Sequence, residues 1–253
     1  MTSVPAATRR QRLRTATVRE IKDTARRLLV EGGPTAISLR AIAREMGMTA
    51  PAIYRYFPSL DGLVQSLVED LFGELHAVLR AARDDAGDNP AAQLSAMARA
   101  FRRWSVAHRP EFGLLFGGPV AGVTAPDRPA CRTADAACAR VGATFLDSFT
   151  ALATSHPLRT APPELVRARL AGHVAPYRQW HGPDLPLELV HTFLSAWIRL
   201  YGLVAMEVFG QLEWAVDDAE PLFELELELF MHQLSAADPC RGSAAGRPAA
   251  TQP

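Results

Sequence analysis

Residues 38–57 read Ser-Leu-Arg-Ala-Ile-Ala-Arg-Glu-Met-Gly-Met-Thr-Ala-Pro-Ala-Ile-Tyr-Arg-Tyr-Phe, and this stretch decides the fold of the domain around it. Ser38 suits the N-cap of a helix of about two turns, and Gly47 suits the position where that helix ends. Thr49 suits the N-cap of a second, very short helix, in which Pro51 falls in the first turn. The pattern predicts a helix-turn-helix, a unit that places its second helix in the major groove of DNA.

Apolar residues at helical spacing continue on both sides of this motif. We predict helices over about 15–31, 60–84, 91–108, 111–116, 129–156, 163–181, 186–211 and 218–235. The sequence shows no convincing β-strand pattern and no internal repeat. It therefore predicts an all-α fold, in which an N-terminal three-helix helix-turn-helix domain is joined to a larger helical domain.

The domain boundaries follow from the breaks between these helices and from composition. We expect a flexible basic arm over residues 1–13 and the helix-turn-helix domain over 14–74. The larger helical domain is expected over 75–236. Residues 237–253 are small, polar and rich in Pro and Gly, so we expect a disordered tail there.

Charge is divided unevenly along the chain. Residues 1–60 carry eleven basic and four acidic groups, a net charge of +7, and the remainder carries −7. A basic head on an acidic body indicates that the head meets a polyanion. Arg9, Arg10, Arg12 and Arg14 stand in or beside the expected arm, where they either follow DNA phosphates or belong to a solvated tail.

The sequence also bears on location, disulfides and metals. We find no run of about 18 apolar residues, the length a membrane span requires, so we expect a cytoplasmic protein without a membrane partner. Cys131 and Cys138 are seven residues apart in a predicted helix, which separates them by about 10.5 Å, too far for a disulfide. The histidines show no metal-ligand spacing. We expect neither a metal site nor a cofactor.

The segment from about Arg14 to Glu74 resembles the DNA-binding domain of the TetR family of tetracycline-repressor-like regulators. The resemblance is carried by Ser38, the Ile42-Ala43 pair, Gly47, Thr49, the run Ile53-Tyr54-Arg55-Tyr56-Phe57 and Pro58-Ser59. It implies DNA contacts at Ser38, Arg40, Thr49, Ala50, Pro51, Ala52, Tyr54, Arg55 and Tyr56.

Within this set, the resemblance implies different roles. Tyr54 and Tyr56 match positions that hydrogen-bond phosphate, and Arg40 matches one that can reach a base edge, where arginine suits guanine. Residues 50–52 offer no side-chain hydrogen bonds, so we expect Arg40 and Thr49 to carry much of the specificity. Leu60 stands where the family often has Lys or Arg, which removes one expected phosphate contact.

The two last predicted helices, about 185–211 and 218–235, are the most apolar part of the chain. Such helices either form a subunit interface or are buried within one subunit. The family resemblance implies the first, a homodimer built on these two helices from each subunit. The stretch with Trp197, Gly202 and Glu207 is similar to one subgroup of the family.

The resemblance also implies that the larger domain binds a small molecule and forms the dimer. We predict a ligand pocket among the helices between 91 and 181, although each aromatic residue there, taken alone, more commonly fills the core. The candidates are Phe101, Trp104, Phe112, Phe116, Phe145, Phe149, Tyr177 and Trp180.

These observations favour a DNA-binding transcriptional regulator, a homodimeric repressor released from a palindromic operator by an unknown small molecule. One alternative is an all-α enzyme whose helix-turn-helix is structural. The sequence carries no Gly-rich phosphate loop, nucleophile elbow or His-Glu-x-x-His motif, so we expect no enzyme. Another alternative is an activator, or a regulator controlled by a protein partner. The sequence distinguishes this alternative poorly from a ligand-controlled repressor.

Overall fold

A computed structural model of the chain describes residues 8–117, 137–174, 177–178 and 185–235. Within these ranges the structure is helical and has no strand, which confirms the all-α prediction. The elements are α1 (Arg9–Gly32), η1 (Pro34–Ala36), α2 (Leu39–Glu45), α3 (Ala50–Ile53), α4 (Leu60–Asp85), α5 (Pro90–Ala107), α6 (Arg109–Phe116), α7 (Ala137–Ser155), α8 (Pro163–Leu170), α10 (Leu187–Val208) and α11 (Glu220–Ser235).

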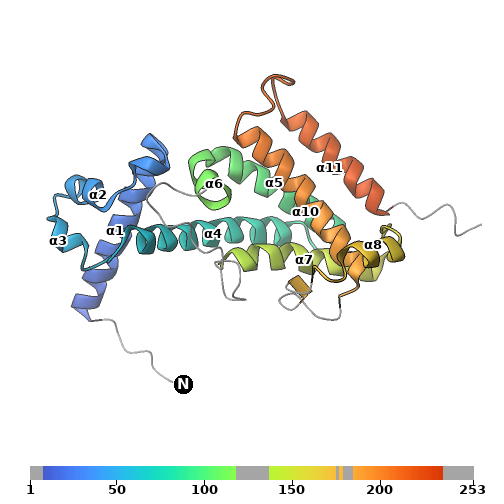
Figure 1. Cartoon of the computed structure of the whole chain (residues 1–253), viewed down its shortest axis with the longest axis horizontal. Coiled ribbons are helices and arrows are strands. Elements are labelled where there is room, and N and C mark those ends of the chain that lie inside the picture. The colour runs from blue at the N-terminus through green and yellow to red at the C-terminus, as the bar shows by residue number, and fades with distance from the viewer. Residues whose placement is uncertain (1–7, 118–136, 175–176, 179–184, 236–253) are drawn as a thin grey trace, which may run out of the picture.

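The elements form a small head and a larger body, and α4 runs from one into the other (Figure 1). In the head, α1, α2, α3 and the first half of α4 bury one apolar cluster, in which Ile21, Ile42, Ile53 and Leu63 are fully inaccessible to solvent. Burying each such side chain contributes about 1.5–3 kcal/mol, so this cluster holds the short α2 and α3 in place.

The body is built around α4, α5, α7 and α10, which share a second apolar cluster. The head cluster ends on α4 at Leu71 and the body cluster begins at Phe72, so one continuous helix serves both cores. The expected domain boundary at residue 74 falls within α4, less than one turn beyond that point.

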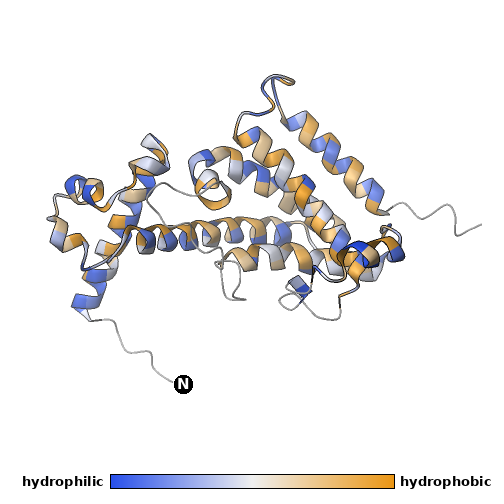
Figure 2. Ribbon diagram, viewed as in Figure 1, coloured by the Kyte–Doolittle hydropathy of each residue, from blue (hydrophilic) through white to orange (hydrophobic). Residues whose placement is uncertain are grey.

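The expectation of a flexible arm over residues 1–13 is wrong for its second half. The first helix begins at Arg9, because Thr8 and Gln11 form a capping box in which each side chain bonds the backbone of the other. Such a box satisfies two free N–H groups and favours a helix start even in a basic segment. Figure 2 shows these first turns as hydrophilic. Residues 1–7 and the expected tail at 237–253 lie outside the described ranges.

Two other sequence-based expectations need correction. The helix expected over 163–181 ends at Leu170. The described part of the helix expected over 129–156 begins at Ala137, and Cys138 within it is disulfide-bonded, whereas no disulfide was expected from the sequence. The other two cysteines lie outside the described residues.

The helix α10 is more apolar than expected, because no stretch of the sequence was expected to be apolar enough to cross a membrane. By length and composition alone, its residues Leu187–Val208 could cross a membrane, although a core helix of a soluble protein can pass the same test. Only 22% of its most apolar 18-residue window is buried within the chain. Most of its other residues are half-buried, and Ile198, Arg199 and Met206 are exposed.

Candidate functional site

The turn between α2 and α3 is held by backbone geometry. Gly47 lies at φ +63°, a left-handed conformation that favours glycine, and it lets the chain reverse directly after α2. The N–H of Met48 then donates to the carbonyl oxygen of Ala43 at 2.8 Å, which closes the turn. Ser38 caps α2 by accepting from the N–H of Ala41 at 3.1 Å. The two helices are thus fixed relative to each other before any ligand binds.

The side chains predicted to read DNA lie on the outside of this unit. Arg40, Thr49, Ala50, Pro51, Tyr54 and Arg55 are exposed, whereas Ser38, Ala52 and Tyr56 are half-buried. Thr49 occupies the N-cap position of α3, but its hydroxyl makes no capping hydrogen bond. The guanidinium of Arg40 has no partner among the described residues. Both groups are therefore available to an external partner.

Arg14, which the sequence placed only among the basic residues in or beside the expected arm, supports the recognition segment. The guanidinium of Arg14, on α1, stacks over the ring of Tyr56 at 5.3 Å and donates to the carbonyl oxygen of Arg55 at 3.5 Å. Arg14 thus contacts the turn that follows α3 from an element more than 40 positions away. A separation of this size gives no local sequence signal.

A polar network joins the head to the body. Arg26 of α1 bonds Glu74 of α4 at 2.8 Å and Glu111 of α6 at 2.9 Å, and Glu74 also accepts from the indole N–H of Trp104 on α5 at 3.0 Å. Partial burial raises the pKa of Glu74, but the hydrogen bonds from Arg26 and Trp104 outweigh it and lower the pKa overall. Four elements therefore meet at one charged junction.

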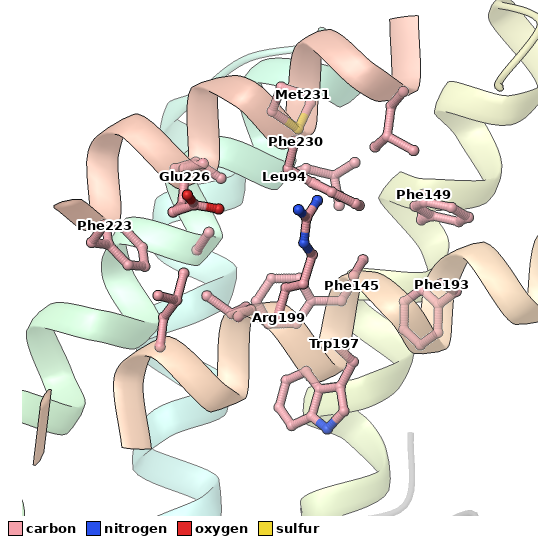
Figure 3. Close-up of a pocket in the computed structure, with 16 residues that line it drawn as sticks. Leu94, Phe145, Phe149, Phe193, Trp197, Arg199, Phe223, Glu226, Phe230 and Met231 are labelled. Atoms are coloured by element: carbon pink, nitrogen blue, oxygen red, sulfur yellow. The ribbon is translucent and has the colours of Figure 1, made fainter. Parts of the chain in front are cut away.

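The body contains a cavity of about 80 Å³ between α5, α7, α10 and α11 (Figure 3). Its lining is almost entirely apolar, and Glu226 and Arg199 are the charged side chains that reach it. The aromatic members of the lining are Phe145, Phe149, Phe193, Trp197, Phe223 and Phe230.

The structure brings only part of the predicted pocket set to this cavity. Phe145 and Phe149 line it. The described remainder, Phe101, Trp104, Phe112, Phe116 and Tyr177, packs in or against the body core, with Phe101 and Phe112 fully buried and in edge contact. Burial raises the pKa of Tyr177 to about 12. Trp180 lies outside the described residues.

The contribution of α11 to the wall of the cavity was not predicted, because its apolar residues were expected at a subunit interface. Residues 223–230 read Phe-Glu-Leu-Glu-Leu-Glu-Leu-Phe, an alternation that places apolar residues on two sides of a helix. Phe223, Leu227 and Phe230 face the cavity, whereas Leu225 and Leu229 are about half exposed. This alternation of apolar and acidic residues is the feature of the sequence that could have predicted an apolar inner face on α11.

Ion pairs tie α10 and α11 to α5. Arg102 is buried and bonds Glu207 of α10 at 2.7 Å and Glu220 of α11 at 2.9 Å, and hydrogen bonding to Glu207 raises its pKa despite desolvation. Arg99 bonds Glu224 of α11 at 2.7 Å. Glu207 belongs to the stretch that resembles one subgroup of the family, and its partner in the structure is Arg102.

Comparisons with known proteins agree with this arrangement. Residues 21–67 match a family model described as bacterial regulatory proteins of the tetR family, and residues 94–230 match one described as a tetracyclin repressor-like C-terminal domain. The HTH-type transcriptional regulators Rv1816 of Mycobacterium tuberculosis and Mb1846 of Mycobacterium bovis are each 34% identical over 193 residues. That alignment covers 76% of this chain and 80% of each relative.

Solved structures show the same fold. The crystal structure of SCO4313 is 34% identical, has a TM-score of 0.70, and aligns over 88% of this chain and 98% of its own. A protein with unknown function from Rhodococcus sp. RHA1 is 19% identical, with a TM-score of 0.63 over 87% of this chain and 95% of its own. Both alignments extend across head and body.

Proposed function

The chain belongs to the TetR family of bacterial transcriptional regulators, and we propose that it acts as a homodimeric repressor that a small molecule releases from a palindromic operator. The observation that carries the proposal is the outer face of α2 and α3. There, a free guanidinium and a free hydroxyl, from Arg40 and Thr49, stand on a rigid basic head.

The proposed DNA contacts divide into two kinds. Arg40 and Thr49 reach base edges, and the apolar start of α3 contacts thymine methyl groups. Tyr54, 48% exposed, contacts a phosphate together with Ser38 and Tyr56. Arg9, Arg10 and Arg12, in the first turn of α1, add attraction that does not depend on sequence.

The proposed dimer rests on exposed apolar residues that gather on α10, α11 and the connection between them. They are Ile198, Met206, Phe209, Trp214, Leu225 and Leu229, which are 38–86% exposed. Large apolar side chains concentrated on one pair of helices mark an interface, because isolated ones are ordinary on protein surfaces. A second copy of the same helices would cover them and place two heads on successive half-sites, about 34 Å apart.

The proposed release by a ligand rests on the cavity and on the junction. A molecule bound between α5, α7, α10 and α11 would lie against helices that also contribute to the proposed dimer, and Trp104 of α5 bonds Glu74 at the junction with the head. A ligand releases DNA only by binding one arrangement of the heads better than the other. As a regulator of genes, the protein would act in the cytoplasm.

A mobility-shift titration would test DNA binding directly. The probe is the DNA upstream of the protein's own gene and of its neighbours, titrated with ligand-free protein at several salt concentrations. We expect a shift confined to DNA with a palindrome, weakening steeply as salt rises because bound phosphates release counterions. Absence of any salt-dependent shift would contradict the proposal.

Two variants separate base reading from phosphate contact. Arg40→Ala should cost about 1–3 kcal/mol on the preferred operator and relax preference at one base pair. Tyr54→Phe should weaken binding to every sequence alike. Arg103→Ala removes the same charge from an exposed site on the body and serves as the control. If Arg40→Ala leaves the base preference unchanged, Arg40 does not read a base edge.

A further inference from the structure

The size of the cavity beneath α11 restricts how it can be used. Ligand pockets usually measure about 300–1,000 Å³, so a cavity of about 80 Å³ admits a drug-sized molecule only if a wall moves. Three walls, α5, α7 and α10, lie between other helices of the body, whereas α11 packs mainly against α5 and α10. The fourth, α11, lies at the edge of the body (Figure 1). It is held by ion pairs such as Arg99–Glu224, whose side chains are 39% and 33% exposed. A ligand would therefore displace α11.

The lining of the cavity indicates the chemistry of that ligand. Six aromatic rings and several aliphatic side chains surround the space, so most of the ligand must be apolar. The rings present electron-rich faces, which attract positive charge. Figure 3 shows the carboxylate of Glu226 and the guanidinium of Arg199 both directed toward the interior, from opposite walls.

The two charged groups differ in what they already bind. Arg199 donates to the side-chain oxygen of Gln233 at 2.9 Å and lies over the ring of Phe230 at 5.5 Å. Glu226 has neither a hydrogen bond nor an ion pair with any described residue. Arg199 is thus held against α11 by one hydrogen bond and one ring contact, although no described carboxylate compensates its charge there, whereas Glu226 makes no hydrogen bond or ion pair with a described residue.

We propose that this cavity binds an apolar molecule that carries a single positive charge. Its apolar part lies among Phe145, Phe223 and Phe230, and its cationic group lies beside Glu226. The proposal rests on the ligand-controlled regulation proposed above, of which it specifies the ligand class. It places the ligand against the inner face of α11, whose outer face carries Leu225 and Leu229 of the proposed dimer surface.

The test compares two probes of equal chain length and opposite charge, decyltrimethylammonium and decyl sulfate, below their micelle concentrations. Calorimetric titration of the full-length protein without DNA measures each affinity. We expect decyltrimethylammonium to bind and decyl sulfate to bind at least about tenfold more weakly. Equal or tighter binding of decyl sulfate would overturn the proposal, as would the absence of binding by both probes.

Three variants locate the site. Glu226→Gln should weaken decyltrimethylammonium binding about tenfold, whereas Glu228→Gln, the same change at an exposed position of α11, should leave it unchanged. Ala196→Leu adds bulk to the wall of the cavity and should abolish binding. Unchanged affinity in Glu226→Gln would overturn the assignment. If that variant does not fold, the two probes on the wild-type protein still decide.

These measurements are independent of the operator. If wild-type protein fails to shift any operator but binds decyltrimethylammonium through Glu226, the regulatory proposal fails and the ligand assignment stands. If it shifts an operator but binds neither probe, the ligand assignment fails and DNA binding stands. Release of the operator by decyltrimethylammonium, lost in Glu226→Gln, would support both.

Discussion

At the scale of single residues, Gly47 determines how α3 is presented. Its φ of +63° strains any L side chain, yet a Cβ there would meet no atom within 4 Å. The cost of substitution is therefore the backbone strain alone. We expect Gly47→Ala to lower the free energy of unfolding by about 1 kcal/mol, as measured by urea denaturation.

Gly73 offers a matched control for that measurement. It lies within α4, also with no atom near a built Cβ, but without a positive φ. Gly73→Ala should raise the free energy of unfolding by about 0.5–1 kcal/mol, because alanine loses less backbone entropy in a helix. The same glycine-to-alanine substitution should thus lower the free energy of unfolding at position 47 and raise it at position 73. A change in the same direction at both positions would contradict the account of Gly47.

Arg14 acts on the recognition segment from a distance. Because its guanidinium packs on Tyr56 and bonds the backbone of Arg55, its role is to position that segment. We expect Arg14→Ala to weaken binding to all DNA sequences while leaving the slope of log affinity against log salt nearly unchanged. Loss of a phosphate contact would instead reduce that slope by about one unit. Mobility shifts at four salt concentrations distinguish the two.

The predictability of these residues from sequence depends on how local their contacts are. Ser38, Gly47 and Thr49 were placed correctly at helix caps and turns because those positions are determined by their neighbours in the chain. The hydroxyl of Thr49 was expected to cap α3 and does not. The contact between Arg14 and Tyr56 depends on packing between elements, which local patterns do not encode.

At the scale of elements, the junction of α1, α4 and α6 joins the head to the body. The side chain of Glu111 is 5% exposed and depends on Arg26, whose side chain is 32% exposed. Arg26→Met would leave that carboxylate buried without its cation. We expect a loss of about 2 kcal/mol in the free energy of unfolding, less than for a fully buried pair because water reaches Arg26.

A double variant distinguishes pairing from packing at this junction. Glu111→Leu combined with Arg26→Met removes the stranded charge, so the double variant should be more stable than Arg26→Met alone. Urea denaturation of the wild type, both single variants and the double variant gives the coupling energy. A double variant that is less stable than Arg26→Met would show that Glu111 stabilises the junction through other contacts.

The bounds of the helices were predicted well where apolar residues repeat strongly at helical spacing. They were predicted poorly where the composition of a segment suggested disorder. The helices α4, α5 and α10 lie close to their expected ranges because their apolar positions repeat at helical spacing. The start of α1 was missed because four arginines suggested disorder, although Thr8 and Gln11 had the spacing of a capping box. The part that α11 plays in lining the cavity was not predicted, because the inward and outward faces of α11 cannot be distinguished without knowing which helices pack against it.

At the scale of the whole molecule, the proposed dimer rests on the apolar surface of α10 and α11. Ile198 is 67% exposed and Leu229 is 45% exposed, and neither lines the cavity. Ile198→Glu together with Leu229→Glu would place two charges in each half of a symmetric interface. We expect this double variant to be monomeric by light scattering and to keep the thermal stability of a folded chain.

The same variant links assembly to DNA binding, because a single head makes few contacts and a palindrome requires two. Operator affinity should therefore fall by at least about tenfold, although the head itself is unaltered. Leu165→Glu is the control, since Leu165 is 55% exposed on α8 and is not part of the proposed dimer surface, and its replacement should leave both dimer and affinity intact. A double variant that stays dimeric would place the interface elsewhere. One that is monomeric but binds the operator as tightly as wild type would show that each head reads DNA alone.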